Sequence, residues 1–254
     1  MTRAGNGIRA AIVAVILAAA FTGKAPAQVP DEFKNLQVLP KGIVKADLLR
    51  EMKGFAIDLG VRCVHCHVGE DNPRLEGIDF ASDEKATKRN ARVMLRMVRE
   101  INGGLLADLK TDRPEKTKVD CATCHHGQPH PRRIEEIVTG LTASKGPEAA
   151  AEEYRKLRKE HYGGFAYDFS EFPLLMLAAD LMQTGKLAEA LAIASLNEEF
   201  YPDSAKIHTT IGEVHRKGGD KEKAIASFKK ALEMDPENRF AKMRLAEMTK
   251  PETP

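Results

Sequence analysis

One five-residue pattern occurs twice in this chain of 254 residues, as Cys-Val-His-Cys-His and as Cys-Ala-Thr-Cys-His. In each copy two residues separate the cysteines, and a histidine follows the second cysteine directly. The first copy contains Cys63, Cys66 and His67, and the second contains Cys121, Cys124 and His125. The chain has 4 cysteines in total, so both copies together account for all of its thiols.

This pattern is the attachment signature of c-type haem. Two thiols on one turn can form thioethers with the two vinyl groups of a single porphyrin, and the next residue brings an imidazole to the iron as its proximal ligand. With 8 histidines in 254 residues, chance would place one after both pairs about once in a thousand chains. We therefore expect two covalently bound haem c groups, with His67 and His125 as proximal ligands.

Two other interpretations of the cysteines need weighing. An exported protein can use four cysteines for disulfides, and Cys-x-x-Cys pairs also bind zinc or exchange thiols. Between Cys66 and Cys121 lie 54 residues, whereas compact zinc ribbons separate their pairs by about 15–20 residues. Neither interpretation explains why histidine follows both pairs.

The first residues have the composition of a secretory signal. Arg3 and Arg9 precede an apolar stretch over 10–21, and small residues at 25–27 offer a cleavage site before Gln28. That stretch is about 12 residues long, whereas a membrane-spanning helix needs about 20, so an uncleaved anchor is disfavoured. We expect export to the periplasm and a soluble protein after cleavage of residues 1–27.

The net charge excludes an electrostatic nucleic-acid binder. The whole chain carries 39 basic and 37 acidic residues, for a formal charge of +2. The signal contains three of the basic residues and no acid, so the charge falls to −1 after cleavage. Partners that are nucleic acids are therefore not expected.

Two predicted helices each precede one copy of the motif. Apolar residues at helical spacing predict helices over 46–59 and 83–101, the second one stopping at an Asn-Gly-Gly sequence. Met52 lies on the apolar face of the first helix, and Met94 and Met97 lie on that of the second. The same order, in which a helix with methionine is followed by a connection and then by Cys-x-x-Cys-His, thus occurs twice. This indicates an internal duplication.

These methionines are candidates for the distal iron ligand. A methionine on an apolar face commonly fills space in a core, but two irons that each need a sixth ligand favour a ligating role. Sulfur opposite histidine gives the low-spin pairing that raises the potential of cytochromes c. We assign Met52 to the first haem and Met94 to the second, with Met97 as the reserve for the second.

Residues 34–131 resemble the cytochrome c subunit family of photosynthetic reaction centres, in a shortened, dihaem form. The matching positions are Lys34-Asn35-Leu36-Gln37-Val38-Leu39, Met52, Cys63–Val68, Ala81-Ser82-Asp83, Arg92, Met94, Val98, Arg99, Asn102, Val119, Cys121, Thr123, Cys124, His125, Gly127, Pro129 and Pro131. The resemblance implies electron-carrier chemistry, with Met52 and Met94 at ligand positions. Members that feed reaction centres usually carry four haems, whereas this chain has two motifs. Asp108 stands at the position of a distal histidine, and His126 stands where the family usually has arginine.

Six cations form a stripe on the predicted second helix, opposite Met94. They are Lys85, Lys88, Arg89, Arg92, Arg96 and Arg99. The stripe fits a solvated helix face, a docking patch for an acidic redox partner, or guanidinium groups that pair with haem propionates.

The last third of the chain repeats with a period of 34 residues, the period of the tetratricopeptide repeat. The paired positions are Gly185 with Gly219, Ala190 with Ala224, and Pro202 with Pro236. We predict repeats over 171–204 and 205–238, with a helix over 147–161 before them and a capping helix over 237–248. Residues 139–147 have the composition of a linker. The repeats either dock a protein partner, which we favour, or only brace the haem domain.

Together these features predict a mainly α-helical protein. A dihaem cytochrome c domain occupies residues 28–138, and a tetratricopeptide-repeat array occupies 146–254. We expect an electron carrier in which no side chain is catalytic. The redox proteins that it connects would be periplasmic or part of a membrane-bound electron-transfer complex. The alternatives are a dihaem peroxidase-like enzyme, which needs an iron with an open distal position, and a haem-bearing sensor or scaffold protein.

Overall fold

The computed structural model describes residues 29–110 and 117–250. Every regular element in these ranges is helical, apart from one isolated antiparallel bridge between Val68 and Asp79. The mainly α-helical fold is therefore confirmed. The predicted signal over 1–27 lies outside the described residues. No helix in the described ranges is long and apolar enough to cross a membrane.

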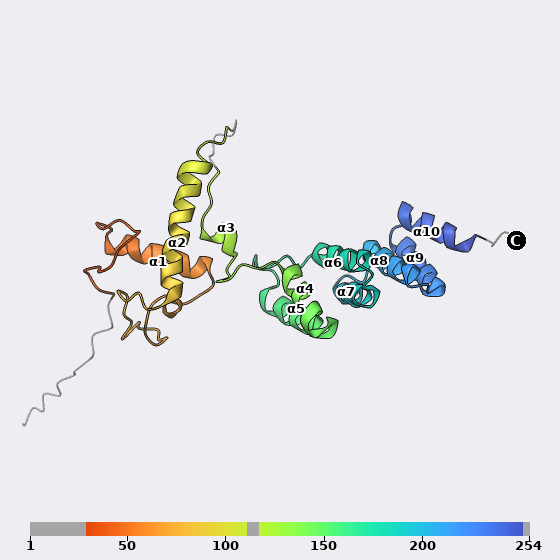
Figure 1. The fold of residues 1–254 in the computed structure, drawn as a ribbon, viewed down its shortest axis with the longest axis horizontal. Coiled ribbons are helices and arrows are strands. Elements are labelled where there is room, and N and C mark those ends of the chain that lie inside the picture. Colours follow the sequence, from red (N-terminus) through yellow and green to blue (C-terminus); the bar gives the residue numbers. More distant parts are fainter. Residues whose placement is uncertain (1–28, 111–116, 251–254) are drawn as a thin grey trace, which may run out of the picture.

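The chain forms an elongated molecule with the two motifs at one end and a stack of helix pairs at the other (Figure 1). The first part contains α1 (Lys45–Asp58), a 3-10 turn (Cys63–His65), α2 (Ala86–Glu100), a π turn (Ile101–Leu105) and α3 (Cys121–His125). The second part contains α4 (Ile134–Lys145), α5 (Pro147–His161), α6 (Glu171–Gln183), α7 (Leu187–Phe200), α8 (Ala205–Lys217), α9 (Lys221–Met234) and α10 (Arg239–Thr249).

Both predicted helices of the first part are present as α1 and α2, but α2 begins and ends differently from the prediction. The Asp79 carboxylate accepts hydrogen bonds from the backbone amides of Ala81 and Ser82 at 2.8 and 2.9 Å. These bonds hold the preceding residues in a turn, so α2 begins at Ala86. At the other end of α2, the Asn-Gly-Gly sequence does not end the helical path. The chain continues after Glu100 as the π turn from Ile101 to Leu105.

The prediction that residues 139–147 form a linker is wrong. Those residues form the second half of α4 and the turn into α5, with Gly146 at a positive φ of 91°. Ile134 and Val138 on α4 are completely buried. The buried apolar residues of α4 lie before residue 139. The composition of residues 139–147 alone therefore did not indicate a helix.

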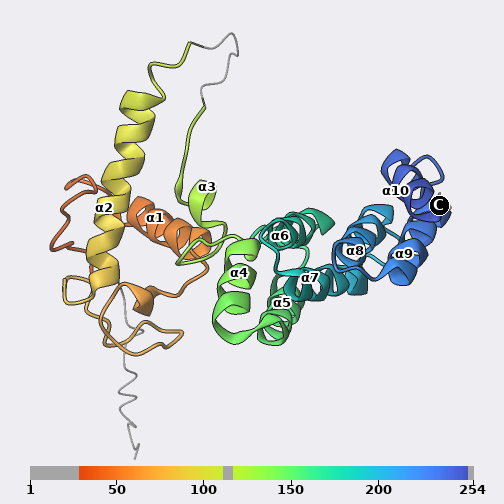
Figure 2. The ribbon, with the colours of Figure 1, turned by 45° about the vertical axis from the view of Figure 1, so that its right-hand side comes forward.

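The helix pairs of the second part stack on one another, as Figure 2 shows for α4–α5, α6–α7 and α8–α9. The two predicted repeats correspond to α6–α7 and α8–α9, each with a first helix of 13 residues and a second of 14. One apolar core runs from α4 to α8, and a smaller one joins α9 to α10. The helix predicted over 147–161 is α5, and the predicted capping helix is α10.

Candidate functional site

The first motif is one tight turn fastened to the start of α2. The amides of Cys66 and His67 both donate to the Cys63 carbonyl, at 3.2 and 3.0 Å. From α2, the Thr87 hydroxyl donates to the His65 carbonyl at 2.5 Å, and the Lys85 ammonium donates to the backbone of the same turn. Both thiols therefore lie on a single short turn, as attachment to one porphyrin requires.

The His67 imidazole is half-buried beside an aromatic ring. Its ring meets the Phe80 ring edge-on, with centroids 5.0 Å apart. Burial and the nearby Lys88 ammonium hold the pKa of His67 below its ordinary value. Its Nδ1 atom is buried and has no hydrogen-bond partner among the described residues. A lowered pKa favours the neutral imidazole, which is the form that ligates a metal.

The second motif is the short helix α3, which is closed by a capping box. The Asp120 carboxylate accepts from the Thr123 amide at 2.9 Å, and the Asp120 amide donates to the Thr123 hydroxyl at 3.0 Å. The Thr123 hydroxyl and amide lower the pKa of Asp120. Asp120, directly before Cys121, and Thr123, between the two cysteines, thus help to fix the turn that carries the thiols. The Asp-x-x-Thr spacing of residues 120–123 is the sequence signal for this cap.

The chain reverses direction directly after His125. His126 and Gly127 both adopt left-handed conformations, with φ 51° and 77°. This reversal places the Gln128 carbonyl 2.7 Å from the His125 Nδ1 atom. A carbonyl can only accept, so Nδ1 carries the proton and Nε2 keeps its lone pair free for iron.

The cationic stripe on α2 does not face solvent as a whole, nor is it a free docking patch. The Lys88 ammonium donates to the carbonyls of Phe80, Ala81 and Ser82, and Arg92 forms an ion pair with Asp83 at 2.8 Å. Arg99 donates to the Val38 carbonyl at 2.7 Å. Lys85 and Arg89 likewise donate to backbone carbonyls. These cations hold the segments around residues 35–38 and 80–84 against α2, a tertiary role that sequence periodicity does not reveal.

An open cavity of about 380 Å³ lies between α1 and α2, with Cys121 at its wall. Phe55, Leu95 and Val98 make part of its lining apolar. None of the candidate methionines lines it. Met52 is half-buried on α1, and Met94 and Met97 on α2 are each 43% exposed. The structure thus places all three methionines on the predicted helices and does not distinguish Met94 from Met97.

The part of the chain with the two motifs has almost no apolar core. Among the described residues before Ile134, Leu48 is the one hydrophobic side chain that is buried. Seven large hydrophobic side chains there remain exposed: Val44, Ile57, Val93, Met94, Met97, Leu105 and Leu109. An apolar group of the size of a porphyrin on each motif would cover such surface. Together with the paired thiols and the two imidazoles, this uncovered surface fits haem.

The other interpretations of the cysteines fit less well. All four thiols are free. In the described ranges no group of three or more His, Cys, Asp or Glu side chains is close enough to hold a metal ion. A zinc site that combines the two Cys-x-x-Cys pairs is therefore absent from this part of the chain.

The family model for the photosynthetic reaction centre cytochrome c subunit matches residues 9–179. The chain belongs to this family. A tetratricopeptide-repeat model matches residues 205–238, which are α8, α9 and their flanking turns. These matches confirm the resemblance seen in the motifs and the second predicted repeat. Family membership implies covalently bound haem c, and the match also extends through α4 and α5 into α6.

Similarity to individual proteins is partial. Cytochrome c-554 of Chloroflexus aurantiacus is 36% identical over 97 residues, which are 38% of this chain and 21% of that protein. This chain thus matches about a fifth of the relative's length. Two solved structures align with 46% of this chain. The first tetratricopeptide domain of Spaghetti (RPAP3), bound to an HSP90 peptide, is 17% identical with a TM-score of 0.32 over 87% of its length. The second such domain of human RPAP3, with an HSP70 peptide, is 18% identical with a TM-score of 0.33 over 93%.

Proposed function

We propose that this protein is a periplasmic dihaem c-type cytochrome that carries single electrons between redox proteins. The observation that carries the proposal is the pairing of two thiols and an imidazole on one short turn, twice, in a region without a core of its own. Each bound haem would take one electron from a donor protein as its iron passes from ferric to ferrous, and would give that electron to an acceptor.

The chain's own residues would hold each haem in the same way. Cys63 and Cys66 would fix the first haem and Cys121 and Cys124 the second, with His67 and His125 on the proximal sides. We keep Met52 and Met94 as the distal ligands. In support, both lie on helices next to the motifs, and the Met94 side chain is uncovered. Met97 has the same exposure as Met94 and remains the reserve.

The repeat array would dock a protein partner and keep it near the haems. Six large hydrophobic side chains in the array stay exposed: Tyr162 and Phe165 in the connection between α5 and α6, Phe172 and Met176 on α6, and Phe240 and Met243 on α10. Exposed apolar side chains that gather on particular helices are typical of interaction surfaces. The partner we propose is a redox protein of the periplasm or of a membrane-bound electron-transfer complex.

Mass spectrometry and redox titration of the exported full-length protein test this function. We expect the mass of two haems, two low-spin haems that are inert to carbon monoxide, and cleavage before Gln28. Replacing both cysteines of either motif with alanine should remove one haem. A single haem in the unaltered protein would contradict the dihaem proposal. A high-spin haem with peroxide turnover would instead support the peroxidase-like alternative, and a cytoplasmic, uncleaved product would contradict the location.

A further inference from the structure

Gln128 connects the second motif to the repeat array through two different groups. Its backbone carbonyl accepts a hydrogen bond from His125 Nδ1 at 2.7 Å. Its side-chain amide donates to the carbonyl of Ala166 at 2.6 Å, and the residue is 8% exposed. Gln128 is the one buried polar residue among the described residues before α4. A buried amide needs such a partner, so its side chain is held in place.

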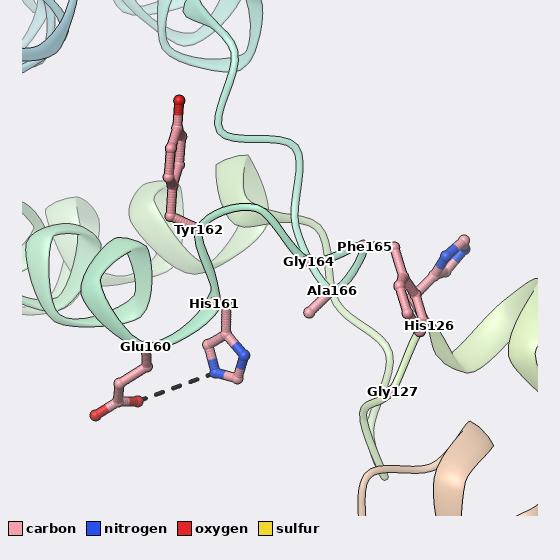
Figure 3. Close-up of a pocket in the computed structure, with 8 residues that line it drawn as sticks. All are labelled: His126, Gly127, Glu160, His161, Tyr162, Gly164, Phe165 and Ala166. Atoms are coloured by element: carbon pink, nitrogen blue, oxygen red, sulfur yellow. Dashed lines mark ion pairs between the residues drawn. The ribbon is translucent and has the colours of Figure 1, made fainter.

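Ala166 lies in the connection between α5 and α6, which follows His125 by some forty residues of chain but runs beside it in space. Figure 3 shows His126 and Gly127 next to Phe165 and Ala166. A Cβ atom on Gly127 would lie 3.8 Å from the Phe165 ring, which is ordinary van der Waals contact. The connection therefore packs directly against the turn that follows the second motif.

Arg158 anchors this connection to the array. Its guanidinium lies 4.3 Å from the Tyr162 ring centroid and 4.5 Å from that of Phe200 on α7. It also donates to the Phe169 carbonyl at 2.8 Å. Cation–π contacts and a charged hydrogen bond on one partly buried guanidinium fix the two ends of the connection relative to each other.

On this basis we infer that Gln128 is a positioning residue by which the repeat array sets the ligand strength of His125. A hydrogen bond from Nδ1–H makes the opposite ring nitrogen a stronger donor. A stronger imidazole donor favours ferric over ferrous iron and lowers the reduction potential. At the first motif, the Phe80 backbone affects the His67 pKa, but His67 Nδ1 makes no well-formed hydrogen bond in the described part of the chain and has no link to the array like that of Gln128. The inference rests on the proposed role of His125 as an axial ligand.

The test compares two substitutions in the haem-loaded, full-length protein. Gln128→Leu keeps the backbone carbonyl but removes the bond to Ala166. Arg158→Lys acts from within the array and keeps the charge while losing the planar group that stacks on the rings. Gln183→Leu, at the exposed end of α6, is the matched control. Redox titration should show that Gln128→Leu raises one of the two midpoint potentials and leaves the other unchanged. Arg158→Lys should move the same potential in the same direction by a smaller amount, and the control should move neither.

The His125 ring provides a second, independent measurement. In the NMR spectrum of the reduced protein, the Nδ1 proton should exchange with solvent faster in Gln128→Leu than in the unaltered protein. Unchanged potentials and exchange in both variants would overturn the inference, as would an equal shift of both potentials. If Gln128→Leu does not fold, Arg158→Lys decides by the same criteria. A mass without haem at the second motif of the unaltered protein would overturn the proposed function instead.

Discussion

Gly60 and Gly127 lie so close together that a Cβ atom on Gly60 would be 2.1 Å from the Gly127 carbonyl oxygen. Beside this contact, the Gly127 amide donates to the Asp58 carbonyl at the end of α1, at 2.9 Å. The helix that carries Met52 therefore ends against the turn that follows His125. The segments that carry the two motifs meet here, and glycine is required where their backbones approach.

Gly60→Ala should destabilise the protein. Gly60 has a left-handed backbone with φ 63°, which costs a residue with a side chain about 1–2 kcal/mol, and the overlap with Gly127 adds about 1–3 kcal/mol. Gly54→Ala in the middle of α1, where nothing lies within 4 Å of the new Cβ, should raise the free energy of unfolding by about 1 kcal/mol. Denaturant unfolding of the holoprotein measures both. Equal stability of the two variants would show that the close approach is absent.

The two proposed methionine ligands should each affect one haem. Met52→Ala and Met94→Ala should each abolish the absorption between sulfur and ferric iron in one haem and lower its potential, because the thioether stabilises ferrous iron. Met97→Ala is the control, since its side chain is on the same helix and equally exposed. Loss of the absorption in the Met97 variant, with retention in the Met94 variant, would exchange their assignments.

Asn102→Leu should loosen the second motif from the π turn that follows α2. The Asn102 amide donates to the Val119 carbonyl at 2.7 Å and its oxygen accepts from the Val119 amide at 2.9 Å. Leucine removes both bonds and leaves two backbone groups without these partners, which costs about 1–3 kcal/mol. Asn102→Asp keeps the acceptor but removes the donor, so it should lower the free energy of unfolding by less than Asn102→Leu. Unfolding free energies check this order, and a leucine variant as stable as the unaltered protein would contradict it.

Asp83 should make the stability depend on pH in acid. A hydrogen bond from Arg92, with others from the neighbouring side chains, holds the pKa of Asp83 well below its ordinary value of 3.8. A carboxyl whose pKa is lower in the folded state stabilises the protein fully above the unfolded value and loses that contribution as the pH falls below it. Asp83→Asn should therefore be less stable than the unaltered protein at pH 7, and the difference should shrink below about pH 4.

The measurement for Asp83 is the unfolding midpoint of both proteins across that pH range. Asp108→Asn, a change at an exposed acid, is the control and should leave the midpoint at pH 7 nearly unchanged. A difference between Asp83→Asn and the unaltered protein that stays constant down to pH 2 would contradict the role of the ion pair.

Gly212→Ala should destabilise the array although it improves helix propensity. A Cβ atom at this position of α8 would lie 2.7–3.0 Å from three atoms of the Phe228 ring on α9. Phe228 is completely buried, so the ring has no room to move, and overpacking costs about 1–3 kcal/mol. This exceeds the gain of about 1 kcal/mol from replacing a helical glycine. Gly140→Ala on α4, which meets nothing within 4 Å, should stabilise the protein in the same unfolding measurement.

Features that depend on residues close together in sequence were predicted well. The two motifs, α1 and the period of 34 residues all follow from local spacing, because a turn or a helix is built from neighbours. The end of α2 was predicted less well. Its Asn-Gly-Gly sequence is a stop signal by propensity, yet the chain continues there as the π turn while the Asn102 side chain binds Val119.

Features that depend on distant partners were missed or misread. The stripe from Lys85 to Arg99 was expected at the surface, at a partner or on haem propionates, whereas five of its six cations donate to backbone carbonyls, among them those of Asn35 and Val38. The Gln128 side chain carried no sequence signal, because the carbonyl that it binds belongs to Ala166, 38 residues further along the chain. Periodicity describes which face of a helix a residue occupies, not what covers that face.

The sequence by itself determined the chemistry of this protein. Thiol and imidazole groups at fixed spacing are sufficient to recognise c-type haem attachment, since the reacting groups lie on one turn. Only the tertiary structure decided how the two attachment segments meet at Gly60 and Gly127, and how the array reaches His125 through Gln128. Those contacts join backbone groups far apart in the chain, and hydrogen bonds to a carbonyl do not depend on which side chain the carbonyl's residue carries. No residue pattern marks them, so the folded chain alone reveals them.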